Sequence, residues 1–323
     1  MASAKEISNR IKSIKDTMKI TKAMYMMSSM KLRKARVKLE NTEPYFYGLQ
    51  KQITEILLHF PNIEHIFFDN RSEDNLEKVK KKAIIVVTGD KGMAGAYNHN
   101  VLKAALELLK ERKDYRLFVI GEVGRHYFSS LGYNVEENFP YSVSNPSIHR
   151  ARVITEIMVE LYKNEEIDSV EVVYTRMINS MKEEVEIARI LPLKTKEFLK
   201  KEMIEQLGDN VSKDEEYVIH PSPENVIENV AYNYLTGFLY GVLVEATASE
   251  ENARMMAMQS ATDNAEAMLH DLSIEFNRVR QAAITQEITE VIGGAKALKK
   301  KKEKAKAQRK VMQIMKEAAT DDV

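Results

Sequence analysis

Two rows of side chains, one near each end of the chain, advance along the sequence by alternating steps of four and three residues. The first row is Ile7, Ile11, Ile14, Met18, Thr21, Tyr25, Ser28, Leu32, Ala35 and Leu39, and the second is Met255, Met258, Thr262, Ala265, Leu269, Leu272, Phe276, Val279 and Ala283. This alternation averages 3.5 residues and keeps one face of a helix turned toward a partner helix. We therefore expect the two ends to wind on each other and to carry the middle of the chain as a side domain. Such a layout favours a mechanical element over a binding pocket.

The helical signals extend beyond both rows. Residues 3–58 predict one helix, which Pro44 should kink or end because proline removes a backbone donor. A polar and charged linker should follow at 61–82.

A second long helix is predicted near the C-terminus. It should run from Glu224 to Val291, with Ser222 as its N-cap and Pro223 at its first position. Two glycines four residues apart, Gly237 and Gly241, are expected to allow close helix approach, and the Gly293-Gly294 pair is expected to break or weaken the helix. Residues 299–310 hold eight basic residues against Glu303 and predict a basic tail that could also be helical.

The middle of the chain changes its period. Strands are predicted at 83–87, 116–120, 170–175 and 184–190, helices from about 96 to 110 and at 122–131, 148–163 and 196–206, and an edge strand at 217–219. Strands that alternate with helices indicate a small α/β domain with a largely parallel sheet. The last two long strands should pair as a hairpin around Asn179-Ser180.

Charge is balanced overall but not locally. The chain holds 48 Lys and Arg against 48 Asp and Glu, so the total suggests no polyanionic partner. Residues 1–40 hold 11 basic and three acidic residues, a balance of 11 − 3 = +8. This face could meet an acidic surface, and a solvated coiled-coil exterior explains it equally well. The sequence has no cysteine, no apolar run long enough to span a membrane and no apolar signal segment at its start.

The only phosphate-like motif is the loop Gly89-Asp90-Lys91-Gly92-Met93-Ala94-Gly95. It lacks the Gly-Lys-Ser/Thr order and the hydroxyl of a P-loop, and its glycine spacing differs from a dinucleotide fingerprint. We interpret it as a tight turn between a strand and a helix. The seven histidines have no metal-ligand spacing, so we expect no catalytic, cofactor or metal site in this chain.

Polar residues inside the heptad rows carry more information. Thr21, Ser28 and Thr262 replace large apolar residues, which lowers stability and tunes register or flexibility. The last helix is also rich in hydrogen-bonding groups, namely Arg254, Asn264, Asn277, Arg280, Gln281, Thr285 and Gln286. These groups could face a partner protein or only solvent.

Two sets of short motifs, one at each end of the chain, form a specific pattern. The N-terminal matches are Lys5-Glu6-Ile7, Arg10-Ile11, Lys19-Ile20-Thr21-Lys22-Ala23-Met24 and Lys31-Leu32-Arg33-Lys34-Ala35. The C-terminal matches are Ala248-Ser249-Glu250, Ala253-Arg254-Met255, Ala257-Met258, Ala261-Thr262-Asp263-Asn264-Ala265, Phe276-Asn277-Arg278-Val279-Arg280-Gln281-Ala282 and Ile284-Thr285-Gln286-Glu287-Ile288-Thr289-Glu290, ending at Gly294-Ala295. Together these motifs resemble the gamma subunit of F-type ATP synthase, of the bacterial type. The loop after the first strand departs from the family pattern, and the resemblance covers about residues 2–298.

The resemblance implies a central rotor shaft. A long antiparallel coiled coil of the N- and C-terminal helices would turn inside the hexamer of alpha and beta subunits, and a Rossmann-like α/β domain would lie at the base with the epsilon subunit and the c ring. The implied divisions are 1–60, 61–221, 222–298 and a basic extension at 299–323. Nucleotide chemistry would belong to the beta subunits, and Met24, Arg254, Gln281, Thr285 and, more weakly, Lys22 match positions that contact them. The implied location is peripheral, on the cytoplasmic face of the bacterial plasma membrane, without insertion into the membrane.

The family pattern normally ends near Leu298, and 323 − 298 = 25 further residues follow here. This tail could project beyond the hexamer or fold back as a regulatory brake. One alternative for the whole chain is a coiled-coil scaffold whose basic helix binds a partner such as nucleic acid, although aromatic or arginine-rich interleaving is sparse. Another is a nucleotide-using α/β enzyme with helical arms, which the defective glycine loop disfavours.

Overall fold

The computed structural model describes residues 3–68, 81–112, 114–139, 142–179, 182–205 and 218–318. Its contacts divide the chain into two units, one formed by Met1–Thr21 with Ala261–Val323 and the other by Lys22–Ser260. Two long helices, α1 (Ala4–His59) and α8 (Pro223–Ala318), each contribute residues to both units. The units are described separately below.

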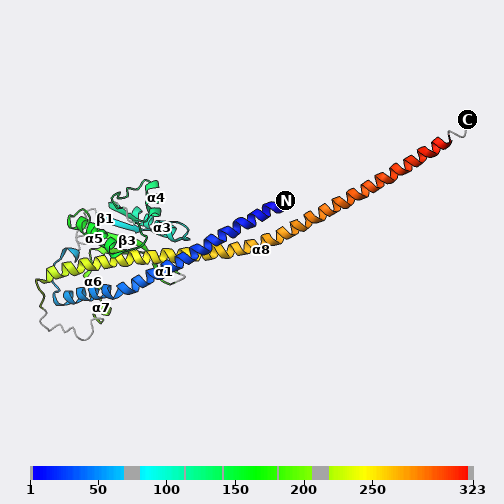
Figure 1. Ribbon diagram of the computed structural model, residues 1–323. Coiled ribbons are helices and arrows are strands. Elements are labelled where there is room, and N and C mark those ends of the chain that lie inside the picture. Colours follow the sequence, from blue (N-terminus) through cyan, green and yellow to red (C-terminus); the bar gives the residue numbers. More distant parts are fainter. Residues whose placement is uncertain are drawn as a thin grey trace. The chain divides into compact units, whose positions relative to one another are not determined.

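The larger unit contains a four-stranded mixed sheet (Figure 1). Its strands are β1 (Lys82–Val87), β2 (Tyr115–Ile120), β3 (Ser169–Met177) and β4 (Glu183–Leu191), in the order β2-β1-β3-β4. The central strand β1 pairs in parallel with β2 and β3, and Ile85 lies opposite Phe118 on one side and Val172 on the other. The strands β3 and β4 pair antiparallel. All four predicted strands and the predicted hairpin are therefore confirmed.

Alternating side chains of β1 enter two cores, one on each face of the sheet. Ile84 and Val86 belong to a core with residues of α3 (Tyr97–Lys110). Ile85 and Val87 belong to a larger core with residues of α5 (Ile148–Lys163), α1 and α8. The short helix α4 (Glu122–Ser130) buries Phe128 in the first core. The second core fixes the sheet to the parts of the long helices that belong to this unit.

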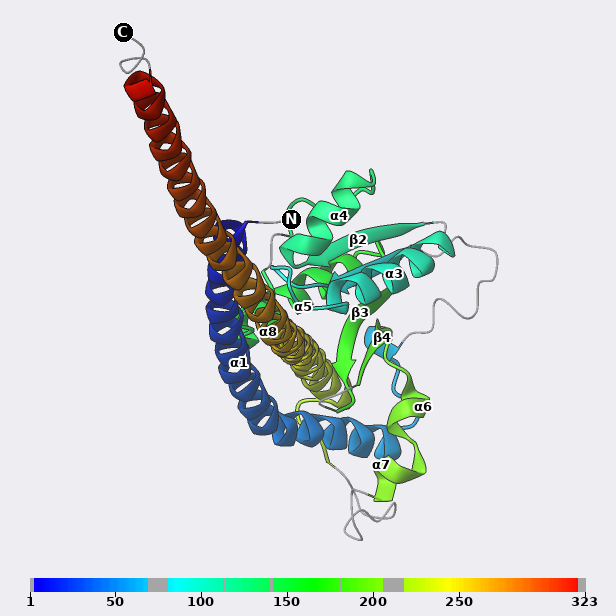
Figure 2. The ribbon, with the colours of Figure 1, turned by 90° about the vertical axis from the view of Figure 1, so that its right-hand side faces the viewer.

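Within the larger unit, α1 and α8 run antiparallel. Lys31 contacts Glu251, whereas Phe46, further along α1, stacks on Tyr234, which comes earlier in α8. Pro44 does not end α1, which continues to His59, and Figure 2 shows α1 bending in this part of the chain. Packing of the apolar face against the core compensates for the backbone bond that proline removes.

Several sequence-based boundaries need correction. The expected linker contains a short 3-10 helix, η1 (Ile66–Phe68), whose Phe67 is fully buried, and the rest of that linker at 69–80 lies outside the described residues. The expected helix at 196–206 is two short helices, α6 (Thr195–Phe198) and α7 (Lys201–Glu205). The expected edge strand is wrong at 218–219, which lie outside any strand, and residue 217 is not described.

The predicted N-cap of α8 is confirmed, because the Ser222 hydroxyl accepts a hydrogen bond from the backbone N–H of Asn225 and Pro223 opens the helix. The expected break at Gly293-Gly294 is wrong, since α8 continues to Ala318. A helical glycine costs about 1 kcal/mol relative to alanine, and the strong helix formers that follow at 295–302 offset that cost.

In the smaller unit, both heptad rows form the least exposed face of their helix. Ile7, Thr21, Thr262 and Ala265 are buried. The other members of the rows in this unit, up to Val279, are half-buried. The Thr21 and Thr262 hydroxyls share a hydrogen bond of 2.8 Å, so each polar seam residue satisfies the other. The row is wrong at its last member, because Ala283 is exposed, as is every side chain from residue 280 to 306.

Candidate functional site

The predicted contact residue Arg254 lies inside the larger unit rather than on its surface. Its side chain is 8% exposed. One guanidinium nitrogen, Nη1, lies 3.0 Å from Glu251 Oε2, and the other, Nη2, pairs with Glu250 one turn earlier in α8. The same Nη2 also donates to the carbonyl oxygens of Lys91 and Gly92, at 3.4 and 3.5 Å. Arg254 therefore joins α8 to the glycine-rich loop that follows β1.

A lysine of α1, with a largely exposed side chain, reaches this network from outside. Lys31 Nζ lies 2.9 Å from Glu251 Oε1. Glu251 therefore pairs with a basic side chain from each long helix, Lys31 on α1 and Arg254 on α8. Burial raises the pKa of Glu251, but hydrogen bonds from Lys31 and Ser28 and the charge of Arg254 outweigh it, and the pKa is lowered. Burial dominates at Glu250, whose pKa is raised despite the Arg254 partner. Glu251 is therefore the more acidic of the two carboxyl groups.

The glycine-rich loop is shaped to approach this network. A Cβ at Gly89 would lie 2.8 Å from Glu250 Oε1, a distance that requires Glu250 to move. The backbone N–H of Gly89 donates to Asn98 Oδ1 at 2.8 Å. Gly95 and Met93 both adopt a positive φ, at 55° and 61°. This geometry fits the expected tight turn between strand and helix. The turn leaves the carbonyl oxygens of Lys91 and Gly92 facing Arg254.

Asp90 fixes the other side of the same loop. Its carboxylate accepts hydrogen bonds from the hydroxyls of Ser142 and Ser144 and from the backbone N–H groups of Val143 and Ser144. Burial acts to raise the pKa of Asp90, but these four donors outweigh it and hold the pKa below its usual value. The charged carboxylate therefore ties the loop after β1 to the segment before α5.

We expect Asp90→Asn to destabilise the protein at pH 7 and to matter less in acid. The folded pKa of Asp90 lies below the unfolded value of about 3.9, so its contribution is complete above that value and is lost as the pH falls through the folded pKa. The thermal unfolding midpoint of the variant should therefore lie below that of the wild type at pH 7, and the difference should shrink at about pH 3. Asp271→Asn on the exposed face of α8 is the matched control. An equal deficit at both pH values would contradict the prediction.

The other predicted contact residues lie at the surface or near it. On α1, Met24 is half-buried and Lys22 is exposed. In the smaller unit, Gln281 and Thr285 are exposed and lie one turn apart on α8, where the Thr285 hydroxyl donates to the Gln281 carbonyl at 2.9 Å. Exposed apolar residues flank this pair at heptad spacing, namely Ile284, Ile288, Val291 and Leu298. These residues form the apolar row, which the sequence-based seam did not include.

The sequence also failed to single out Glu250, Glu251 and Asp90. Two glutamates four and three residues before an arginine on a helix are a recognisable pairing signal. Nothing local marks Asp90, because its donors come from more than 50 residues further along the chain.

The described residues contain no group of three or more His, Cys, Asp or Glu side chains arranged to hold a metal ion. Among the same residues, no helix is both long and apolar enough to cross a membrane. The described parts do offer an internal ion-pair junction around Arg254 and an exposed helical surface at the end of α8.

Comparison with known proteins agrees with this geometry. The sequence model described as ATP synthase matches residues 3–298. The chain is 44% identical over 295 residues to the ATP synthase gamma chain of Ruminiclostridium cellulolyticum, which covers 91% of this chain and 98% of that protein. It is also 44% identical over 299 residues to the ATP synthase gamma chain of Acetivibrio thermocellus, which covers 93% of this chain and 100% of that protein.

Among solved structures, the chain resembles one from the cryo-EM structure of the Euglena gracilis mitochondrial ATP synthase, OSCP/F1/c-ring, in rotational state 3. The TM-score is 0.59 at 16% identity, covering 91% of this chain and 94% of that one, so the likeness supports the fold alone. The expected fold class, an α/β domain combined with a long helical shaft, is confirmed. A match across residues 3–298 and 44% identity over whole relatives show that this chain belongs to the ATP synthase gamma-chain family.

Proposed function

We propose that this chain is the central rotor shaft of an F-type ATP synthase, coupling ion flow through a membrane c ring to ATP synthesis or hydrolysis in an alpha/beta hexamer. The observation that carries the proposal is the 44% identity over almost the full length of named gamma chains. The heptad rows and the exposed end of α8 supply the surfaces that such a shaft requires.

The shaft itself does no nucleotide chemistry in this proposal. As it turns, its asymmetric surface favours the open or the closed state of each of three equivalent beta subunits in turn. It does so because its contacts with a beta subunit differ between those states. Met24, Lys22, Gln281 and Thr285 would contact beta subunits directly. Arg254 would act indirectly, through the buried network with Glu250 and Glu251. The basic face at 1–40 would meet acidic loops of the beta subunits.

The middle of the chain has a separate role in the proposal. Residues 61–221 form the Rossmann-like domain that binds the epsilon subunit and the c ring, whereas 1–60 and 222–298 form the coiled coil. The chain is then a peripheral subunit on the cytoplasmic face of a bacterial plasma membrane, held there through the c ring without inserting into the lipid.

Rotation can be tested with a single chemical handle, because the chain has no cysteine. His126 on α4 has a side chain that is 87% exposed, so His126→Cys provides one labelling site. We expect the labelled chain to co-purify with alpha and beta subunits of the same organism. A bead attached through the new thiol of the His126→Cys variant should then turn when the hexamer is immobilised and ATP is added. The wild-type complex, treated identically, controls for non-specific bead attachment.

The proposal fails if the chain does not join the hexamer or if the bead stays fixed while ATP is hydrolysed. Tight binding of DNA by the isolated chain, without entry into the hexamer, would instead support the scaffold alternative. Nothing in the described residues favours that alternative.

In this proposal the basic extension at 299–323 projects beyond the hexamer. The helix α8 continues to Ala318, and its six lysines between residues 299 and 306 are exposed. Truncation after Leu298 should leave assembly intact and change the rate of hydrolysis or the coupling to ion flow by about twofold or more. Unchanged hydrolysis and coupling in the truncated complex would remove any functional role for the extension.

A further inference from the structure

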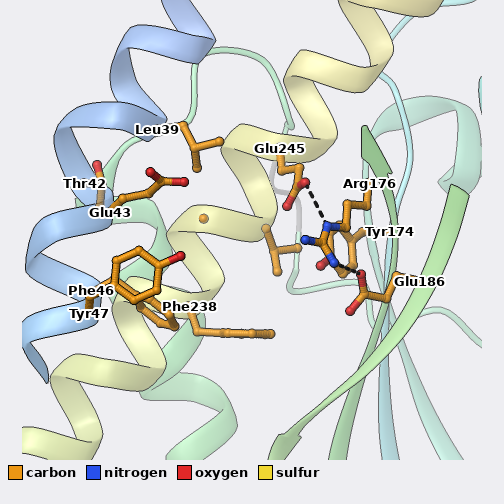
Figure 3. Close-up of a pocket in the computed structure, with 13 residues that line it drawn as sticks. Leu39, Thr42, Glu43, Phe46, Tyr47, Tyr174, Arg176, Glu186, Phe238 and Glu245 are labelled. Carbon is orange, nitrogen blue, oxygen red and sulfur yellow. Dashed lines mark ion pairs between the residues drawn. The ribbon is translucent and has the colours of Figure 1, made fainter. Parts of the chain in front are cut away.

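A cavity of about 280 Å³ lies in the larger unit, between the two long helices and the sheet (Figure 3). Its walls come from α1, from α8, and from the paired strands β3 and β4. All of the lining residues belong to the same unit. Leu39 of the first heptad row lines the cavity, whereas none of the residues proposed to contact partners of the rotor does.

A glycine on α8 keeps the cavity open. A Cβ added at Gly241 would have no atom within 4 Å, so the expectation that Gly241 permits close helix approach is wrong. At Gly237, by comparison, an added Cβ would lie 3.4 Å from Phe46 Cδ2. Glycine inside a helix is less favourable than alanine, because its backbone loses more conformational freedom on folding. Gly241 therefore lowers helix stability and leaves empty volume, with no packing requirement for the missing side chain.

The apolar wall of the cavity is aromatic and already ordered. The Phe46 ring stacks on Tyr234 with centroids 4.8 Å apart and an interplanar angle of 23°. It also lies 6.1 Å from the ring of Tyr47 and 6.3 Å from that of Phe238. Figure 3 shows Phe46 and Tyr47 on the α1 side of the cavity and Phe238 on α8. A flat apolar group entering the cavity would meet ring faces and edges that need little rearrangement.

The polar wall carries an excess of negative charge. The lining residues include Glu43, Glu186 and Glu245 against one cation, Arg176, which gives 1 − 3 = −2 when every group is ionised. Arg176 lies 3.5 Å from a carboxylate oxygen of Glu186 and 3.5 Å from one of Glu245 (Figure 3). Burial raises the pKa of Glu245, Arg176 opposes the rise, and Glu186 and Glu43 add to it. One guanidinium therefore does not balance the three carboxylates.

We propose that this cavity binds a small organic cation with a flat aromatic body. The positive group lies between Glu43 and Glu245, and the ring packs against Phe46, Tyr47 and Phe238. The charge pairs with the unbalanced carboxylates, and the aromatic walls add dispersion and cation–π attraction. Such a ligand contacts both long helices and the sheet at once, so it stiffens the junction between them. The proposal does not depend on the rotor function.

Tryptamine is a suitable probe, because it joins an indole ring to an ammonium group, and 3-ethylindole is its neutral counterpart. We expect calorimetric titration of the full chain to give tryptamine a Kd at least tenfold lower than that of 3-ethylindole. Glu245→Gln and the exposed Glu43→Gln should each weaken tryptamine several-fold and leave 3-ethylindole unchanged. Equal affinity for the two probes, or no binding of tryptamine, would overturn the proposal.

Substitutions at Gly241 that fill the cavity provide a second test of the binding site. Gly241→Leu should abolish binding of both probes, whereas Gly241→Ala, which adds one methyl group, should raise the thermal midpoint and retain most of the affinity. Circular dichroism and thermal melting establish that each variant is folded. A folded Gly241→Leu variant that binds tryptamine like the wild type would place the binding elsewhere and refute the site. Should Gly241→Leu fail to fold, the Glu43→Gln result decides, because Glu43 lies at the surface.

Discussion

Arg254→Met is expected to lower the free energy of unfolding of the larger unit by about 3–5 kcal/mol, the usual cost of removing one partner from a buried ion pair. The side chains involved are 8%, 7% and 5% exposed for Arg254, Glu250 and Glu251, so solvent screens them little. Methionine retains much of the volume but none of the donors. Glu251 keeps its contact with Lys31, while Glu250 loses its guanidinium partner. Urea unfolding of the full chain, followed by circular dichroism, measures the change.

The deficit should depend on pH in a defined direction. Burial already raises the pKa of Glu250, and loss of the Arg254 charge raises it further. A carboxyl group whose folded pKa is raised contributes stability at low pH and loses it as the pH rises through the folded pKa. The Arg254→Met variant should therefore be closer to the wild type at pH 5 than at pH 8. A deficit that grows on acidification would contradict this account of Glu250.

A triple variant separates the loss of charge from the loss of packing. Glu250→Gln and Glu251→Gln combined with Arg254→Met remove the whole charged group, and replacing all members of a buried ion cluster is often neutral. We expect the triple variant to recover at least half of the stability that the single variant loses. If it recovers none, the guanidinium acts through its contacts with the Lys91 and Gly92 carbonyls rather than through the carboxylates.

Urea unfolding of the isolated Arg254→Met chain also distinguishes two roles for Arg254. The family resemblance suggests that it contacts a beta subunit, whereas its side chain here is engaged within its own chain. A residue that acts only through a partner would leave the unfolding of the isolated chain unchanged and impair only the assembled complex. Lower stability of the isolated chain would assign Arg254 to positioning α8 against the loop after β1.

The sequence predicted features that depend on period. The heptad rows identified the buried face of both long helices, because a repeat of 3.5 residues specifies which side of a helix meets its partner. The run at 83–87 identified the central strand, since five successive apolar residues suit a strand covered on both faces. These signals are local, and tertiary packing agrees with them.

The features that the sequence did not predict depend on distant segments. Lys31 and Glu251 are separated by 220 residues, and their pairing follows from the antiparallel packing of α1 and α8. Phe67 lies in the segment predicted as a polar linker, yet it is 1% exposed, because it joins the larger core that contains residues of the sheet and α1. The expected break at Gly293-Gly294 is wrong for a different reason. That expectation gave weight to two unfavourable residues, although helix formation depends on the sum over a longer window.

The apolar row of the smaller unit should be essential for assembly if the chain is a rotor shaft. Ile284 and Ile288 are 44% and 54% exposed, and Val291 is 72% exposed. Branched apolar side chains at heptad spacing are costly to leave in water, and burial of each is worth about 1.5–3 kcal/mol. Gln281 and Thr285 lie on neighbouring positions of the same helix, so the proposed contact residues flank this row. The row therefore marks the surface on which the hexamer would close.

Ile284→Asp with Ile288→Asp is expected to reduce ATP hydrolysis by the reconstituted complex at least tenfold, because two carboxylates would have to enter an apolar interface. Both positions are exposed in the isolated chain, so its thermal unfolding should change little. The matched control is Ala282→Asp with Gln286→Asp, which adds two carboxylates with the same spacing on the opposite side of the helix. The control should retain hydrolysis within about threefold. If both double variants hydrolyse ATP like the wild type, the row is not the contact surface. If both lose hydrolysis equally, the hexamer encloses this segment of α8 from all sides.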